Sequence, residues 1–217
     1  MPVKMLTFPN REEWLKNREN GIGGSEISAI VGHNPYLDNI ALWEYKTGRR
    51  QPEDISEKSY VKYGTNAEYH LRELFKLDFP QYEVFYEENN SFKNDKYPWA
   101  LASCDGWLID EEGRKGILEI KTTEILQSQQ REKWNQQIPM NYYCQCLFYM
   151  AVLEADFCVL KAQLKTVFDG VPYLQTKHYH IEKADVQDDV NLLMSEGAKF
   201  WKYVIEDKKP PLVLPPI

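Results

Sequence analysis

The sequence predicts a mixed α/β domain, of the α+β or α/β type, in which helices flank a central mixed β-sheet. Apolar residues over 57–78 recur three and four apart, as they do on amphipathic helices. Two extended segments joined by a glycine-containing turn follow, and a helical segment then leads to two more strands. Because 43% of the 217 residues are hydrophobic, one substantial core can form, and we expect a single domain over 1–217.

Three helices are expected before the sheet. A pair of glycines leads into a short helix at 25–31, and Asp38 is placed to cap a second helix that extends to about Thr47. The apolar spacing over 57–78 predicts a longer third helix, which must end before Pro80.

Extended segments are then expected at 82–87, 99–109 and 117–122. The turn over 110–116 contains two glycines and joins the last two segments into a hairpin. The remaining elements are predicted to be helices at 128–137 and 139–154, strands at 156–168 and 171–181, and a final helix at 184–206, with Pro139 in the first turn of its helix.

The chain therefore divides into a helical N-terminal part, about 10–80, and a part with the sheet and its helices, about 81–206. The proline-rich tail, 207–217, cannot form regular structure, and we expect it to lie against the surface or a neighbouring subunit.

The charge balance limits the partners. The chain has 26 Lys and Arg against 33 Asp and Glu, a formal net charge of −7, which excludes broad, unselective coating of nucleic acid. The excess of acidic residues lies after residue 62, because residues 1–62 carry nine basic and nine acidic side chains. A local cationic site remains compatible with this composition.

The N-terminal residues lack the basic start and apolar middle of a secretory signal, and no apolar stretch reaches 18 residues. We therefore expect a cytoplasmic protein without a membrane partner. The four cysteines form no C-x-x-C pair, so free thiols in a reducing compartment are expected.

The predicted hairpin carries the most informative polar residues. Side chains two apart on a strand share a face, so Glu119 and Lys121 should project together while their neighbours point into the opposite layer. By the same argument, Ser103 and Asp105 should share a face. If the hairpin pairs these segments, two carboxylates and an ammonium group converge.

Two carboxylates can bind Mg²⁺, which keeps waters and a substrate phosphate oxygen among its ligands. A neighbouring lysine can orient or deprotonate the attacking water, so the set suits phosphodiester hydrolysis. The spacing alone is also compatible with an ordinary surface ion pair between Glu119 and Lys121. The apolar residues around Glu119 and Lys121 favour a functional site over a solvated rim.

These motifs resemble the PD-(D/E)XK nuclease superfamily and, within it, the phage lambda exonuclease or YqaJ-like viral recombinase family. The resemblance covers about residues 15–155, and its motifs occur in the family's order. They are the segments 18–36, 42–48, 103–107 (SCDGW) and 118–122 (LEIKT), the pair Gly64 and Glu68, and the spacing Pro139, Tyr142 and Gln145.

The resemblance implies a restriction-endonuclease-like core in which Asp105 and Glu119 bind metal together with the backbone carbonyl of Ile120. Lys121 would serve the attacking water, and Glu68 would support the metal site. The implied cofactor is Mg²⁺, with two ions per site and Mn²⁺ as a substitute.

Tyr142 and Gln145 lie three apart on one helical face and would reach the same site, although helix packing is the alternative. The resemblance assigns Arg18, Ser25 and Ser103 to a terminal 5′-phosphate. The planar guanidinium of arginine and a Gly-Gly-Ser helix start both suit an anion. The same sequence is also compatible with a solvated arginine and an ordinary glycine-rich helix start.

The function implied by the resemblance is a double-stranded DNA exonuclease. It would act 5′ to 3′ from a phosphorylated end, release mononucleotides and leave 3′ overhangs for a phage single-strand annealing protein. Relatives form a homotrimeric ring, and a phage or prophage origin in a bacterial host is implied.

Two alternatives remain open. One is another PD-(D/E)XK nuclease, either a restriction-type endonuclease or a Cas4-like enzyme. The latter usually has an iron–sulfur cluster on one upstream and three late cysteines, whereas the first cysteine here is Cys104, so no cluster is expected. The other alternative is a DNA-binding module without catalysis.

The chain departs from the family pattern at two uncharged positions. Cys104 replaces the motif's proline, and Leu147 stands where relatives often have a second glutamine, which bears on substrate positioning. His33 and His70 are not expected to be metal ligands, because a single histidine on a helix is more often a packing or surface residue.

Overall fold

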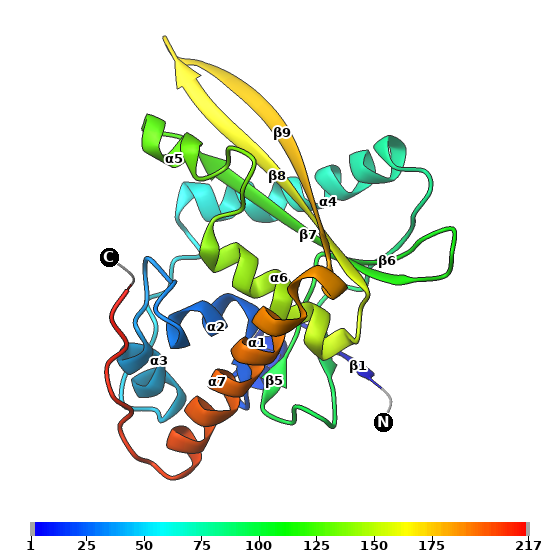
Figure 1. Cartoon of the computed structure of the whole chain (residues 1–217). Helices are drawn as coiled ribbons and strands as arrows, with labels where there is room; N and C mark the ends of the chain where they lie inside the picture. The colour runs from blue at the N-terminus through cyan, green and yellow to red at the C-terminus, as the bar shows by residue number, and fades with distance from the viewer. Residues whose placement is uncertain (1–2, 216–217) are drawn as a thin grey trace.

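The computed structural model of the chain describes residues 3–215 and contains a five-stranded mixed sheet with helices on both faces (Figure 1). The strand order is β3-β6-β7-β8-β9, and every neighbouring pair is antiparallel except β7 and β8. The strands are β3 (Glu83–Phe85), β6 (Gly106–Ile109), β7 (Lys115–Glu124), β8 (Phe157–Phe168) and β9 (Val171–Glu182). The predicted α/β class is confirmed.

Helices provide the two outer layers. They are α1 (Arg11–Glu19), α2 (Gly24–Ile30), α3 (Asn39–Lys46), α4 (Ser59–Asp78), α5 (Ser128–Glu132), α6 (Met140–Leu153) and α7 (Gln187–Ile205), with a 3-10 turn at Lys183–Val186. Four short strands lie outside the main sheet: β1 (Lys4–Thr7) pairs with β4 (Asn90–Lys93), and β2 (Ile22–Gly23) pairs with β5 (Ala100–Leu101).

Each face of the sheet has its own apolar core. On one face, Leu71 and Phe75 of α4 pack with Leu118 and Ile120 of β7. The larger core on the other face contains the buried side of α6 together with α2 and α7. Because β7 is buried on both sides, its polar residues 119 and 121 project into a covered layer and not into open solvent.

The long strands β8 and β9 form a hairpin that projects past the rest of the sheet (Figure 1). Exposed apolar side chains gather near its turn, including Phe168, Tyr173 and Leu174. This hairpin was predicted from alternation alone, and its two strands lie within a residue of the expected bounds.

The expected strand over 99–109 is wrong as a continuous element. It breaks into β5 and β6 because the intervening backbone bonds to β4 and not to the sheet: Phe92 and Ala102 form a bridge, and the Asn90 side chain bonds both backbone groups of Cys104. Ser103 and Asp105 therefore do not share a strand face, contrary to the expectation from period two.

Other differences are at element ends. The helix expected over 128–137 ends at Glu132, where the Gln137 side chain bonds the Glu132 carbonyl at 2.9 Å and Gln136 takes a positive φ of 56°. Pro139 is the N-cap of α6 and not part of its first turn. Elements α1, β1 and β4 were not predicted, because their mostly polar or short sequences show no clear periodicity.

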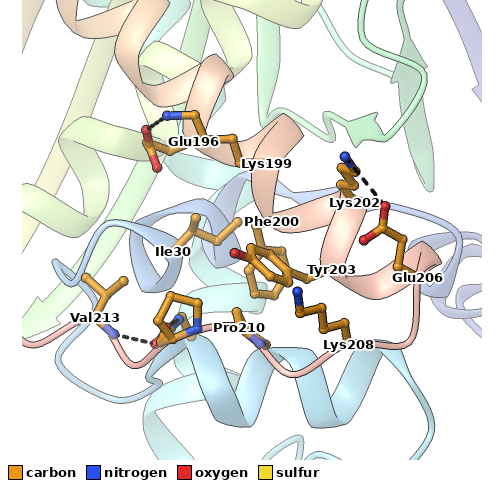
Figure 2. Close-up of a pocket in the computed structure, with 12 residues that line it drawn as sticks. Ile30, Glu196, Lys199, Phe200, Lys202, Tyr203, Glu206, Lys208, Pro210 and Val213 are labelled. Atoms are coloured by element: carbon orange, nitrogen blue, oxygen red, sulfur yellow. Dashed lines mark hydrogen bonds and ion pairs between the residues drawn. The ribbon is translucent and has the colours of Figure 1, made fainter.

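The C-terminal tail has no regular structure, as expected, and crosses α3 and α7. Asn39 of α3 holds it with two hydrogen bonds, donating to the Pro211 carbonyl at 2.8 Å and accepting from the Val213 backbone N–H at 3.0 Å. Figure 2 shows the pocket of about 380 Å³ that the tail helps to line with Ile30 and Phe200. The last two tail positions, 216–217, lie outside the described residues.

None of the helices between residues 3 and 215 is long and apolar enough to cross a bilayer.

Candidate active site

The β6–β7 hairpin brings the two motif carboxylates together. Gly106 pairs with Leu118, so Asp105, just before β6, lies opposite the start of the Glu119 segment. The Asp105 carboxylate accepts a hydrogen bond from the Ile120 backbone N–H at 2.7 Å, which fixes its orientation. The predicted convergence of these residues is therefore present, although Asp105 reaches the site from a loop.

Glu119 is the most buried acidic group of the site, with 1% exposure. Its Oε1 accepts hydrogen bonds from Lys121 Nζ at 2.5 Å and from Gln145 Nε2 at 2.7 Å. Its Oε2 is buried and has no hydrogen-bond partner within the described chain. Burial, followed by the negative charge of Asp105, raises the pKa of Glu119 to about 8.

Lys121 is a cation held by these carboxylates. Burial alone would lower the pKa of Lys121, but the charges of Glu119 and Asp105 outweigh burial and raise it. The ammonium group also lies 5.4 Å from the ring centroid of Tyr142, which in turn stacks on Trp134. Lys121 is therefore an ammonium hydrogen-bond donor near neutral pH.

Helix α4 adds Glu68 and an arginine that the sequence reasoning missed. Arg72, four residues after Glu68, is 4% exposed and donates to Glu68 Oε1 at 3.0 Å and to the Asp105 carbonyl at 2.8 Å. Its guanidinium carbon is 3.4 Å from the ring centroid of Tyr86. Burial, and then Asp105, raises the pKa of Glu68 to about 7. The i, i+4 spacing after Glu68 was the available signal.

Helix α6 provides Gln145, and Tyr149 one turn later. Gln145 donates to Glu119 and also to the Tyr149 hydroxyl at 3.0 Å. Tyr142, on the same helix, reaches Lys121 only through its ring. Leu147 is buried in the core, and its apolar side chain offers no hydrogen bond to the carboxylates.

The donor chemistry fits a hard divalent cation. Two carboxylates that repel each other and an unpartnered oxygen on Glu119 are stabilised by a positive ion, and Mg²⁺ is usually bound through one or two carboxylates plus waters. Across residues 3–215, no three His, Cys, Asp or Glu side chains converge as a fuller ligand set. The remaining ligands would be waters and backbone oxygen, for which Ile120 is the candidate.

Within residues 3–215, no histidine ring or thiol hydrogen-bonds the carboxylates of Glu68, Asp105 or Glu119. His70 is exposed on α4 and stacks edge-on against Tyr69. All four cysteines are buried free thiols, as expected, and Cys104 lies directly beside Asp105 in the chain.

The three residues assigned to a 5′-phosphate are connected through Trp14, which the sequence reasoning did not identify. Arg18 donates to Ser25 Oγ at 3.1 Å and lies over the Trp14 ring at 5.0 Å. The Trp14 indole N–H donates to Ser103 Oγ at 3.2 Å, while Ser103 itself donates to the Asn90 carbonyl. Ser103 is therefore already committed to local bonds, whereas the Arg18–Ser25 pair is exposed.

A lysine on α3 fixes the backbone around this pair. Lys46 Nζ bonds the Arg18 carbonyl at 3.0 Å and Glu26 Oε2 at 2.8 Å, and the same carboxylate oxygen accepts from the Gly23 N–H at 2.7 Å. The motif residues on α1, α2 and α3 thus form one hydrogen-bonded unit. The sequence reasoning grouped these motifs only by resemblance.

Gly24 couples this unit to the carboxylate site. A Cβ at Gly24 would lie 2.2 Å from the Tyr149 ring. Ordinarily Gly→Ala in a helix stabilises by about 0.5–1 kcal/mol. We expect Gly24→Ala to destabilise the protein by about 1–3 kcal/mol, because the ring must move. Urea unfolding measures this, and a stabilised variant would contradict the packing.

Comparison with known proteins identifies the family and the fold of this chain. A family model described as the YqaJ-like viral recombinase domain matches residues 13–156. The uncharacterized protein YqaJ of Bacillus subtilis (strain 168) is 27% identical over 192 residues, which cover 88% of this chain and 56% of the relative. The matched part of this chain thus corresponds to little more than half of that relative's length.

Two solved structures have the same fold. An alkaline exonuclease from Laribacter hongkongensis superposes with a TM-score of 0.66 at 16% identity, covering 90% of this chain and 93% of the other. A phage-related exonuclease from Haemophilus somnus 129PT gives a TM-score of 0.57 at 13% identity, covering 86% and 96%.

Proposed function

The chain belongs to the YqaJ-like viral recombinase domain family, and on that premise we propose that it is a metal-dependent double-stranded DNA exonuclease. It acts 5′ to 3′ from phosphorylated ends, releases mononucleotides and leaves 3′ single-strand overhangs. The exonuclease titles of the two structural relatives support this activity, and the Laribacter enzyme is also known in complex with dAMP.

The observation that carries the proposal is the unpartnered, buried Oε2 of Glu119 beside Asp105. A buried carboxylate oxygen without a donor is costly unless a cation occupies the space next to it. Glu119, Asp105 and the Ile120 carbonyl would hold Mg²⁺, for which Mn²⁺ can substitute, with two ions per site. A bound divalent ion supplies Lewis acidity at the phosphoryl group and a more acidic water.

The chain's own residues perform the remaining steps. Lys121 donates hydrogen bonds to the attacking oxygen or to a phosphate oxygen, and its charge offsets the charge that develops there. Gln145 holds Glu119 in place, and Arg72 holds Glu68 and the Asp105 carbonyl. Glu68 has a pKa near neutrality and can take up a proton as the water is consumed.

The polarity of the reaction rests on Arg18. Gly24, next to Ser25, packs against the Tyr149 ring, and the Tyr149 hydroxyl accepts from Gln145, which also bonds Glu119, so a phosphate held by Arg18 and Ser25 would lie near the carboxylates. A planar guanidinium is suited to bind phosphate through two hydrogen bonds. The strand whose 5′ end is held there would be the one degraded.

The family's role in viral recombination extends the proposal to partners. We assign this chain to a homotrimeric ring around duplex DNA, in the cytoplasm of a bacterial host, with a phage single-strand annealing protein that receives the 3′ overhang. The exposed apolar tip of the β8–β9 hairpin is a surface that such contacts could cover.

The experiment that tests the activity uses linear duplex with phosphorylated 5′ ends, labelled separately at each terminus, beside a closed circular control. With Mg²⁺, early release of 5′-labelled mononucleotide and an intact circle are expected. Cleavage of the circle would favour a restriction-type endonuclease. No cleavage with either Mg²⁺ or Mn²⁺ would favour a DNA-binding module.

Arg18→Ala provides a test of the phosphate contact. The wild-type protein should degrade 5′-phosphorylated duplex faster than 5′-hydroxyl duplex, because a charged hydrogen bond contributes about 1.5–3 kcal/mol. The variant should lose most of that preference, roughly 10- to 100-fold, when initial rates on the two ends are compared. Arg50→Ala, an exposed arginine paired with Glu44, is the matched control and should retain it. Equal wild-type rates on both ends would remove Arg18 from this role.

A further inference from the structure

Tyr36 is a tyrosine held in an unusually exposed position. Its side chain is 88% exposed, although the backbone beneath it is well ordered by hydrogen bonds. Asn34 Oδ1 accepts from the Tyr36 N–H at 2.9 Å and from the Leu37 N–H at 3.1 Å, which closes a tight turn. The turn thus presents a large aromatic ring to solvent, where a ligand can reach it.

The same turn is tied to the proposed phosphate pair. The Asn34 side chain also donates, through Nδ2, to the Ser25 carbonyl at 3.3 Å. Asn34 thus connects the backbone of Ser25, whose hydroxyl bonds Arg18, with the backbone of Tyr36. The backbone that carries the ring is therefore held in a constant relation to the backbone of Ser25.

Two further tyrosines affect the Tyr36 hydroxyl. Partial burial, and then the hydroxyls of Tyr142 and Tyr60, raise the pKa of Tyr36, although its side chain as a whole is exposed. The Tyr142 ring is 5.4 Å from Lys121 Nζ, and Tyr60 is 58% exposed at the start of α4. The geometric tie of Tyr36 is therefore to the phosphate pair, through the Asn34 bonds to the Ser25 carbonyl and to the Tyr36 N–H.

Hydrolysis at the end of a duplex has a requirement that an exposed aromatic ring beside the phosphate pair can meet. The terminal nucleotide must leave its base pair before its phosphodiester reaches buried carboxylates, and unpairing costs a few kcal/mol. An exposed aromatic ring offers any base a stacking partner, independent of sequence. We propose that Tyr36 stacks on the unpaired base of the 5′-terminal nucleotide, which makes it a substrate-positioning residue; this inference rests on the proposed exonuclease function.

The expected effect follows from the strength of stacking. Replacing Tyr36 with alanine should raise KM for blunt, 5′-phosphorylated duplex roughly 5- to 100-fold. Tyr36→Phe and Tyr36→Trp retain a ring and should stay near the wild-type value. If the hydroxyl group had a structural role instead, Tyr36→Phe would be as damaging as Tyr36→Ala.

A modified substrate separates stacking from other losses. The duplex has a 5′-terminal nucleotide that keeps its sugar and phosphate but lacks the base. The wild-type protein should bind and cut this end more weakly than the normal end, by about the factor that Tyr36→Ala shows on the normal end. Tyr36→Ala should show no additional loss on the abasic end, because the stacking partner is already absent.

Tyr69→Ala is the control variant, since Tyr69 is likewise an exposed tyrosine, at 58%, but lies beside His70 on α4, and its kinetics should not change. Thermal unfolding of each variant checks folding. If Tyr36→Ala loses the same factor on normal and abasic ends, stacking is excluded while the exonuclease function stands. Absence of cleavage by the wild-type protein would instead reject the proposed function itself.

Discussion

Replacing Lys121 with alanine should lower the rate of phosphodiester hydrolysis by about 10²- to 10⁴-fold. The reason is that the Lys121 ammonium is the positive group of this chain that bonds Glu119 directly, at 2.5 Å, and its pKa is raised by the two carboxylates. Without it, charge that develops on the phosphate or on the attacking water loses a donor. Single-turnover rates at saturating metal measure this step without the contribution of product release.

Folding and binding to DNA ends should change much less in the Lys121 variant. The Glu119 carboxylate still accepts from Gln145, and the apolar core of β7 is untouched. Lys115→Ala, at the exposed start of the same strand, is the matched control and should hydrolyse DNA at the wild-type rate. Unchanged turnover in Lys121→Ala would remove the lysine from catalysis, and an unfolded variant would assign it to stability.

The comparison of sequence with structure shows where periodicity is informative. Helix α4 was predicted within two residues of its start because one apolar stripe, which includes Leu71 and Phe75, packs on the sheet. The hairpin of β8 and β9 was predicted for the same kind of reason. Segment 99–109 was wrong because Asn90, from the connection before it, bonds the backbone of Cys104 through its side chain. A hydrogen bond of this kind does not change the spacing of apolar residues, so that spacing could not predict the break in the strand.

The site was predictable where strand geometry or resemblance fixed it. Period two correctly placed Glu119 and Lys121 on one face, since β7 is a regular strand. Trp14 and Tyr149 were missed because their roles come from contacts across the fold: the Trp14 indole bonds Ser103, and the Tyr149 hydroxyl bonds Gln145. Such contacts depend on how helices pack, which a single sequence does not determine.

Glu119→Gln should separate the electrostatic role of the carboxylate from its packing. In the metal-free protein, Glu119 keeps its proton up to pH about 8, whereas the unfolded chain releases it near the ordinary value of 4.5. The folded state therefore binds more protons between these values, and its stability falls as pH rises through this window. Glu68, whose pKa is raised to about 7, acts in the same direction.

We expect the metal-free wild-type protein to lose roughly 2 kcal/mol of stability between pH 6 and pH 8, a fall of several degrees in Tm. Because a divalent cation binds the ionised carboxylates, Mg²⁺ should restore more stability at pH 8 than at pH 6. In Glu119→Gln, the pH dependence should be weaker, the Mg²⁺ effect should be largely lost, and hydrolysis should fall by about 10³-fold or more. Thermal unfolding at both pH values, with and without Mg²⁺, measures the pH dependence and the Mg²⁺ effect on stability. Glu119→Gln removes only the carboxylate. If both proteins show the same pH slope and the same Mg²⁺ stabilisation, Glu119 neither holds the proton that the folded state releases near pH 8 nor binds the metal.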